Sequence, residues 1–194
     1  ADQRSLPARV LSALAPNYDG AGLAMETSQL DVELRLRINE FYARETMLLD
    51  DGRLDEWLGL LAPDVRYTMP FPESSTHPVD DDDGRPPFRL FNDGYESLEL
   101  RIARRATGLA PGETPRTITQ RIVSDILVTD VSDQELCVRS SVMVFLVRHE
   151  RHESFFIGKR QDVLRRDKHS GLLLAARVIT LAHSVLPRAI SIFF

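Results

Sequence analysis

Residues 155–166 read FFIGKRQDVLRR, and residues 172–184 read LLLAARVITLAHS. Each segment is mainly apolar and has the length of a strand in a buried sheet. Only a short polar stretch, residues 167–171, separates them, and such a connection between sequential strands predicts an antiparallel hairpin. We therefore expect the second half of the chain to fold around an antiparallel sheet.

The first of these strands carries charges on a face that should be partly buried. Arg160 and Asp162 lie two residues apart, so on a strand they share a face with Phe156 and Leu164. Buried charges need partners. An internal salt bridge and a contact with another subunit satisfy this need equally well, and both interpretations stay open.

The sequence ends in three large apolar residues, Ile192, Phe193 and Phe194. Left in water, each would forgo roughly 1.5–3 kcal/mol. Pro187 is expected to break the preceding strand, after which this tail can turn back across the domain or onto a neighbouring chain. We therefore predict that the tail is ordered and buried.

The two-residue apolar period begins upstream, near Thr117, and runs through two further strands. Their connections, at 130–133 and 149–152, are again short and polar, so we expect a curved antiparallel meander. Residues 136–147 carry apolar side chains on both faces of the expected strand. This is more apolar surface than two helices can cover, so we expect the chain to form an oligomer. On the first of these strands, Ile122, Ile126 and Val128 are expected to lie on one face. On the second, the residues expected to share a face are Leu136, Val138, Val142, Val144 and Leu146.

The first half of the chain shows the helical period instead. Apolar residues at helical spacing predict a helix over about residues 28–50, capped by Ser28 and ended at Gly52. A shorter helix with Leu54, Trp57, Leu58 and Leu61 on its apolar face should follow and be ended by Pro63. Residues 95–106 should form a third helix.

The remaining segments complete the expected organisation. Residues 65–69 alternate like a half-buried strand, whereas residues 71–94 are rich in proline and aspartate and predict a long loop. Residues 1–27 are expected to be an N-terminal arm, followed by a single domain over residues 28–194. Helices first and then an antiparallel meander indicate an α+β fold, in which the helices cover one face of the sheet.

In order and spacing, these segments resemble the small (β) subunit of Rieske-type aromatic-ring-hydroxylating dioxygenases. The resemblance extends over roughly residues 30–194 and implies the cone-shaped fold of nuclear transport factor 2, with helices packed on a curved antiparallel sheet. It rests on EFYARE at 40–45, LLD at 48–50, Trp57 within LDEWL at 54–58, VRYTMP at 65–70, and the strand at 155–166.

The resemblance also implies a function and partners. In that family the α subunit carries a Rieske [2Fe-2S] cluster and a mononuclear Fe(II), and three α subunits assemble with three β subunits. The enzyme adds both atoms of O₂ to an aromatic ring, with electrons from NAD(P)H delivered by a reductase and often a ferredoxin. This chain is then expected to be a non-catalytic, structural subunit. Its candidate subunit-contact residues are Arg160, Asp162, Arg165, Ile192, Phe193 and Phe194.

The metal ligands of such an enzyme are missing from this sequence. A Rieske cluster needs two cysteines and two histidines, and Cys137 is the one cysteine. The one local histidine cluster, His149 and His152, has a spacing of three residues at an expected hairpin tip, unlike a zinc signature. Asp80–Asp83 do not follow the calcium-loop pattern. We therefore expect no metal, cofactor or catalytic residue in this chain.

Composition excludes further classes. The chain has 24 Lys and Arg against 29 Asp and Glu, a net charge of −5, and no basic block that would bind nucleic acid or an anionic membrane. Its apolar runs are too short to span a bilayer. We expect a cytoplasmic, soluble protein.

Two alternatives from other functional classes stay open. Tyr42, Tyr67, Asp50 and Asp64 could line the pocket of a stand-alone cone-fold dehydratase or isomerase, or of a small-ligand-binding protein. Each also has an ordinary structural explanation, because tyrosines on apolar stripes and aspartates at element ends are common. Co-purification separates the classes, since only a β subunit should bring a larger iron–sulfur protein with it.

Overall fold

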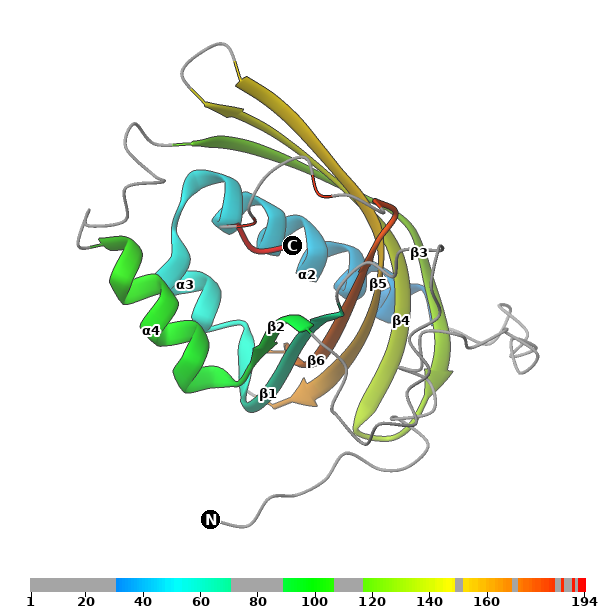
Figure 1. The fold of residues 1–194 in the computed structure, drawn as a ribbon. Coiled ribbons are helices and arrows are strands. Elements are labelled where there is room, and N and C mark those ends of the chain that lie inside the picture. Colours follow the sequence, from blue (N-terminus) through cyan, green and yellow to red (C-terminus); the bar gives the residue numbers. More distant parts are fainter. Residues whose placement is uncertain are drawn as a thin grey trace, which may run out of the picture.

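The computed structural model describes residues 31–70, 89–106, 117–148, 152–168 and 171–183, together with 186, 190 and 192–194. These residues form helices packed against one curved sheet (Figure 1). The helices are α2 (Val32–Asp51), α3 (Leu54–Leu58) and α4 (Tyr95–Ala106); the strands are β1 (Leu61–Pro70), β2 (Arg89–Asp93), β3 (Ile118–Val131), β4 (Glu135–Arg148), β5 (His152–Asp167) and β6 (Gly171–Leu181).

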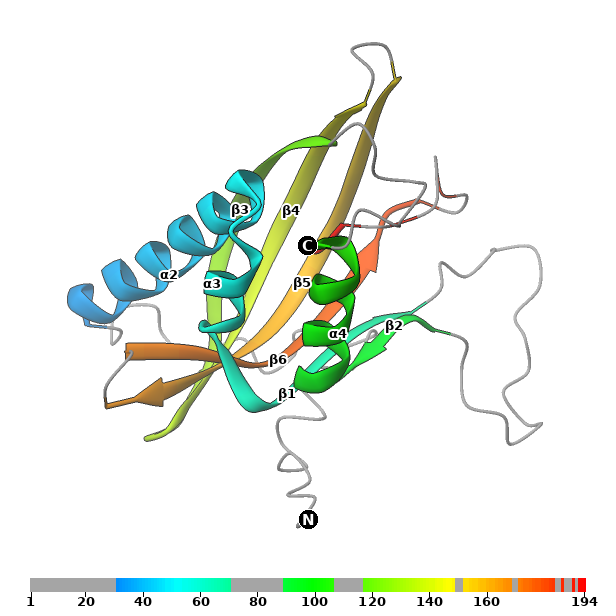
Figure 2. The same ribbon diagram turned by 90° about the vertical axis from the view of Figure 1, so that its left-hand side faces the viewer.

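The strands lie in the order β2-β1-β6-β5-β4-β3. From β3 to β6, each strand pairs antiparallel with the next, which confirms the predicted meander. The first strand, β1, pairs parallel with β6 and antiparallel with β2, and neither pairing follows from the sequence pattern. Figures 1 and 2 show the helices on the concave side of the sheet, so the fold is the expected cone-shaped α+β architecture.

The helix α2 begins later than predicted. Asp31 caps it by accepting a hydrogen bond from the backbone N–H of Glu33 at 3.3 Å, whereas the expected cap, Ser28, lies outside the described residues. Its C-terminal end is confirmed, because Gly52 adopts φ 72, a left-handed conformation that glycine tolerates well. The predicted bounds of α4 are also confirmed.

The predicted stop of the second helix was wrong. The helix α3 ends at Leu58, and β1 begins at Leu61, before Pro63. The pairing of β1 with β6 shifts register between Leu61 and Arg66. Pro63 lies within this irregular part of the strand, so it interrupts the ladder rather than ending a helix.

The predicted shared face of Ile122, Ile126 and Val128 was also wrong. The ladder of β3 and β4 shifts register between Ser124 and Leu127, and Asp125 adopts a positive φ of 53. This bulge adds a residue and exchanges the two faces. Ile122 is therefore 53% exposed on the outer face, whereas Ile126 and Val128 pack against the core.

The core fills the concave side of the sheet. The predicted inward set of β4 is buried there: Leu136, Val138, Val142, Val144 and Leu146. Cys137 is buried, and no helix of the described part of the chain is long and apolar enough to cross a membrane. The N-terminal arm expected at residues 1–27 lies outside the described residues, so the arm boundary stays a prediction. The loop predicted at 71–94 was wrong at its end, because β2 occupies Arg89–Asp93; residues 71–88 lie outside the described residues.

Candidate functional site

Four charged side chains are buried together between α2 and the sheet. Glu45 comes from α2, Arg160 and Asp162 from β5, and Arg177 from β6, and all four are at most 1% exposed. Tyr42 lies three residues before Glu45, so the two project from the same face of α2. We call these five residues the ion-pair network.

Arg177 is the centre of the ion-pair network. Its Nε and Nη2 donate to the two carboxylate oxygens of Asp162, both at 2.8 Å. Its Nη1 and Nη2 donate to the two carboxylate oxygens of Glu45 at 2.7 and 2.9 Å. Burial alone would lower the pKa of Arg177, but the neighbouring charges of Asp162 and Glu45 hold it well above its ordinary value.

Arg160 occupies a weaker position in the network. Its Nη1 donates to Glu45 at 3.2 Å, its Nε donates to the hydroxyl of Ser140 at 3.2 Å, and its guanidinium lies over the ring of Tyr42. Its Nη2 is buried and has no hydrogen-bond partner among the described residues. The network contains two carboxylates and two guanidiniums, so its charges balance.

The pKa values of Asp162 and Tyr42 move in opposite directions. Burial would raise the pKa of Asp162, but the charges of Arg177 and Arg160 and the hydrogen bonds from Arg177 and Tyr42 outweigh it, so the pKa is lowered. Burial and the charge of Asp162 raise the pKa of Tyr42 well above its ordinary value. Tyr42 therefore stays a neutral donor to ionised Asp162, at 2.9 Å.

The tail lies beside this network and is buried, as predicted. The hydroxyl of Tyr67 donates to the backbone oxygen of Phe194 at 2.8 Å and accepts from its N–H at 2.7 Å. Arg177 Nη1 donates to the same oxygen at 2.6 Å. Arg121 Nε and Nη2 donate to the carbonyl of Phe193 at 3.2 and 2.7 Å. Backbone atoms of the tail are thus held by side chains of three strands.

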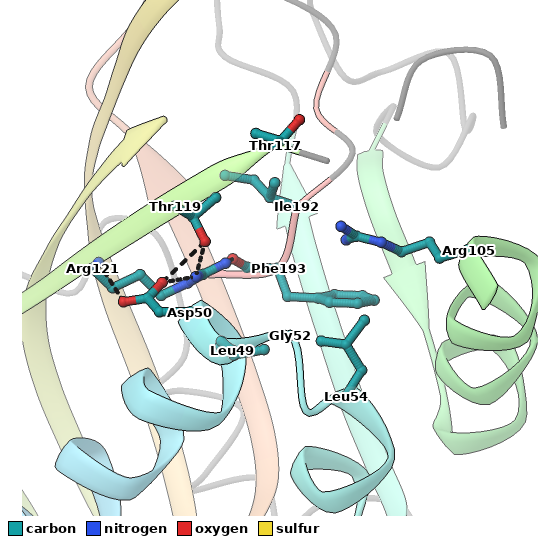
Figure 3. A pocket seen from close by; sticks show the side chains of 10 residues that line it. All are labelled: Leu49, Asp50, Gly52, Leu54, Arg105, Thr117, Thr119, Arg121, Ile192 and Phe193. Carbon is teal, nitrogen blue, oxygen red and sulfur yellow. Dashed lines mark hydrogen bonds and ion pairs between the residues drawn. The ribbon is translucent and has the colours of Figure 1, made fainter. Parts of the chain in front are cut away.

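Asp50, near the C-terminal end of α2, holds the side chain of Arg121 on β3 in place. It accepts hydrogen bonds from the hydroxyl of Thr119, from the backbone N–H of Arg121 and from Arg121 Nη1 (Figure 3). A pocket beside them has a volume of about 30 Å³ and is bordered by Phe193 and Ile192. This is room for about one water molecule, and too little for an aromatic ring.

The candidate acid–base residues are not presented to a substrate. Tyr42, Tyr67 and Asp50 are each occupied by the internal hydrogen bonds described above. Asp64 is not brought near them: its half-exposed side chain pairs with Arg165 at 2.7 Å, away from the ion-pair network. The arrangement therefore orients buried charges and the tail, and leaves no acid–base pair facing an open cavity in the described part of the fold.

The predicted subunit-contact residues divide into two groups. Arg160, Asp162 and the tail are buried in contacts within this chain. Arg165 is 30% exposed and pairs with Asp64 and Glu135. Their role between subunits stays a prediction, because the described contacts belong to one chain.

Sequence reasoning missed Glu45 and Arg177. Each interrupts an apolar pattern: Glu45 lies on the buried stripe of α2 between Tyr42 and Leu48, and Arg177 lies inside the run LLLAARVITL of β6. A charge on a buried stripe needs a partner of opposite sign, and this signal would have found both residues.

The expected absence of a metal site stays a prediction. Within the described ranges, no three His, Cys, Asp or Glu side chains gather as metal ligands would. Of the candidate cluster of His149 and His152, residues 149–151 and the side chain of His152 lie outside the described part of the chain.

We expect Tyr67 to make the stability of the chain sensitive to alkaline pH. Burial is the main cause that raises its pKa from 10.0 to about 12, although the charge of Arg177 and the hydrogen bond to Phe194 oppose it. A raised pKa favours the neutral phenol in the folded chain. Its contribution is therefore complete below pH 10 and is lost as the pH rises towards 12, by about 1.4 kcal/mol per unit.

The measurement is urea unfolding of the wild type and of Tyr67→Phe between pH 8 and pH 11. At pH 8 the wild type should be the more stable, because Tyr67→Phe leaves the N–H of Phe194 unpaired. That advantage should shrink by about 1.4 kcal/mol at pH 11. A difference independent of pH would show that Tyr67 does not titrate in this range.

Comparison with known proteins identifies what the chain is similar to. Residues 44–188 match the model of a family described as the ring hydroxylating beta subunit. The beta subunit of 3-phenylpropionate/cinnamic acid dioxygenase of Photorhabdus laumondii is 36% identical over 165 residues, which are 83% of this chain and 91% of that subunit.

Solved structures share the fold at low sequence identity. A chain of naphthalene 1,2-dioxygenase has a TM-score of 0.79 at 18% identity, over 98% of this chain and 100% of that one. A candidate scytalone dehydratase of Novosphingobium aromaticivorans has a TM-score of 0.58 at 19% identity, over 81% of this chain and 91% of that one.

Proposed function

Because the chain belongs to the family of ring-hydroxylating dioxygenase beta subunits, we propose that it is the structural, non-catalytic β subunit of such an enzyme. The complete enzyme uses O₂ and electrons from NAD(P)H to convert an aromatic compound into a cis-dihydrodiol. An α subunit binds the aromatic ring, and a reductase, with or without a ferredoxin, supplies the electrons. We place this assembly in the cytoplasm.

The observation that carries the structural role is the filled interior. A cone-fold enzyme needs an open pocket in which acid and base groups face the substrate. Here that interior contains the ion-pair network and the tail, and the pocket beside them measures about 30 Å³. The tyrosines and aspartates that an isomerase or dehydratase would use are bound to neighbouring groups of the chain itself.

The cofactors of the enzyme do not fit this chain. One cysteine, buried Cys137, cannot provide the two thiolates of a Rieske cluster. The cluster and the mononuclear Fe(II) are therefore assigned to the α subunit, and this chain contributes the scaffold on which α subunits assemble.

The outer face of the sheet supports an assembly of several copies. Its apolar side chains lie opposite one another across three strands: Ile118 pairs with Val147, Ile122 with Met143, Met143 with Ile157, and Phe145 with Phe155. The Phe145 and Phe155 rings are 4.9 Å apart. Large exposed apolar patches mark interaction sites. We call these seven residues the outer patch and propose that it is buried against further copies of this chain, in a trimer that carries three α subunits.

The proposal is tested by purification from the organism of origin under mild conditions. A tagged chain should co-purify with a larger protein in a one-to-one ratio, and the complex should contain iron and acid-labile sulfide. Its mass should correspond to three copies of each subunit. A chain that is purified alone and shows dehydratase or isomerase activity would overturn the proposal.

We expect Phe155→Glu to dissociate the copies without unfolding them. Phe155 is 48% exposed in the outer patch, so glutamate costs little in a single chain but would place a charge in the contact between copies. Sedimentation at micromolar concentration should show monomers for this variant and trimers for the wild type. Leu100→Glu is the control, since Leu100 is 68% exposed on α4, away from the patch. Trimers in both variants would exclude the outer patch as the contact.

A further inference from the structure

The backbone of the tail is gripped by buried side chains from three different strands. Tyr67 on β1, Arg121 on β3 and Arg177 on β6 make five hydrogen bonds to backbone atoms of Phe193 and Phe194. In three of these bonds an arginine donates to a backbone oxygen, and charged donors make the stronger hydrogen bonds. None of the five bonds involves a side chain of the tail.

The side chains of the tail occupy two separate aromatic sites. The ring of Phe193 stacks on Trp57 with centroids 4.8 Å apart and also contacts Tyr67. The ring of Phe194 meets Phe156 edge to face at 5.7 Å. Both geometries are favourable for aromatic pairs, and each ring lies fully within the core.

The groups that grip the tail are held by the rest of the chain. Glu45 and Asp162 fix Arg177 through four hydrogen bonds. Asp50 and Thr119 fix Arg121. The donors therefore point toward the position of the tail without needing the tail to orient them, and such preorganisation lowers the cost of binding.

Bonds to the backbone combined with pockets for side chains are the usual means of peptide recognition. We infer that the interior of the cone is a peptide-binding site for a segment with two consecutive aromatic residues. In this chain its own tail fills the site, and the same segment should fill it when supplied as a separate molecule. This inference goes beyond the structural-subunit role, and its failure would leave that role untouched.

The first test uses a chain that lacks residues 192–194, refolded with and without a synthetic peptide of residues 186–194. The peptide should restore folding and raise the melting temperature saturably, with one peptide per chain. A peptide with Phe194→Ala should bind at least about tenfold more weakly, since one buried ring is lost. Indole serves as a probe of space filling alone. If indole raised the melting temperature as much as the peptide does, filling the space would explain the stabilisation, and the inferred recognition of the peptide backbone would be wrong.

The second test does not depend on the shortened chain folding. The full-length variant Phe194→Ala keeps the backbone atoms that accept and donate these hydrogen bonds, but its tail lacks one buried ring and binds the interior less tightly. Fluorescently labelled peptide should bind this variant at least about tenfold more tightly than it binds the wild type, whose intact tail competes at high effective concentration. Equal binding to both chains, or binding to neither variant, would show that the interior is an ordinary core and not a peptide site.

Discussion

Arg177→Ala is expected to abolish folding, or to leave a chain that is recovered only from the insoluble fraction. The substitution leaves Glu45 and Asp162 buried with one of their two cations removed, and it also removes a hydrogen bond to Phe194. Breaking a buried ion pair costs about 3–5 kcal/mol, and here one residue serves two pairs. A domain of this size has about 5–15 kcal/mol of stability in total, so most of it should be lost.

Two further arginines provide graded controls. Arg160→Ala should cost less than Arg177→Ala, because Arg160 makes one longer contact with Glu45, at 3.2 Å, and leaves Asp162 with its main partner. Arg165→Ala should cost under about 1 kcal/mol, because Arg165 is 30% exposed and water replaces its contacts.

Urea unfolding measures all three variants against the wild type. Equal, small losses in all three would show that the buried charges contribute no more than surface pairs do. An Arg160→Ala loss larger than that of Arg177→Ala would show that Arg160, and not Arg177, is the centre of the network.

The sequence predicted elements whose pattern is long and local. The strands β3 to β6 alternate over many residues and are joined by short polar connections, so both their pairing and their order follow from the sequence. The inward face of β4 and the extent of α4 were predicted for the same reason. The short β2 was missed, because a strand of five residues with one buried side chain, Phe91, has no readable period.

The partners of the buried charges could not be predicted in the same way. Arg160 and Asp162 were recognised as charges on a buried face, and the closest arrangement in sequence would pair them with each other. In the structure, Arg160 pairs with Glu45 and Asp162 pairs with Arg177. Those pairs join residues 115 and 15 positions apart. The Arg160–Glu45 pair depends on how α2 crosses the sheet, which no local pattern encodes. Asp162 and Arg177 are direct partners in the ladder of β5 and β6, so their contact depends on the register of that hairpin.

The site of the tail illustrates the same limit. Burial of Ile192, Phe193 and Phe194 follows from their apolar character alone. The place where the tail binds depends on Tyr67, Arg121 and Arg177. These residues come from three strands and lie close together only in the curved sheet.

Removal of residues 192–194 is expected to give insoluble chains or chains that do not assemble. The deletion removes three buried apolar side chains and leaves the donors of Arg121, Arg177 and Tyr67 facing an empty interior. Replacing one buried phenylalanine by alanine already costs about 3–5 kcal/mol. The deletion should therefore exceed the effect of any single substitution in the tail.

Phe194→Ala separates the contribution of the side chain from that of the backbone grip. It should lower the free energy of unfolding by about 3–5 kcal/mol, because Phe194 is fully buried against Phe156. Phe155→Ala is the matched control: it removes the same side chain from the outer face, where 48% of the residue is already exposed, and should cost the single chain much less.

Co-expression with the α subunit, followed by size-exclusion chromatography and thermal melting, measures stability and assembly together. A shortened chain that forms the full complex at an unchanged melting temperature would show that the tail is not part of the core, since no intact core loses two buried phenylalanines without a measurable cost.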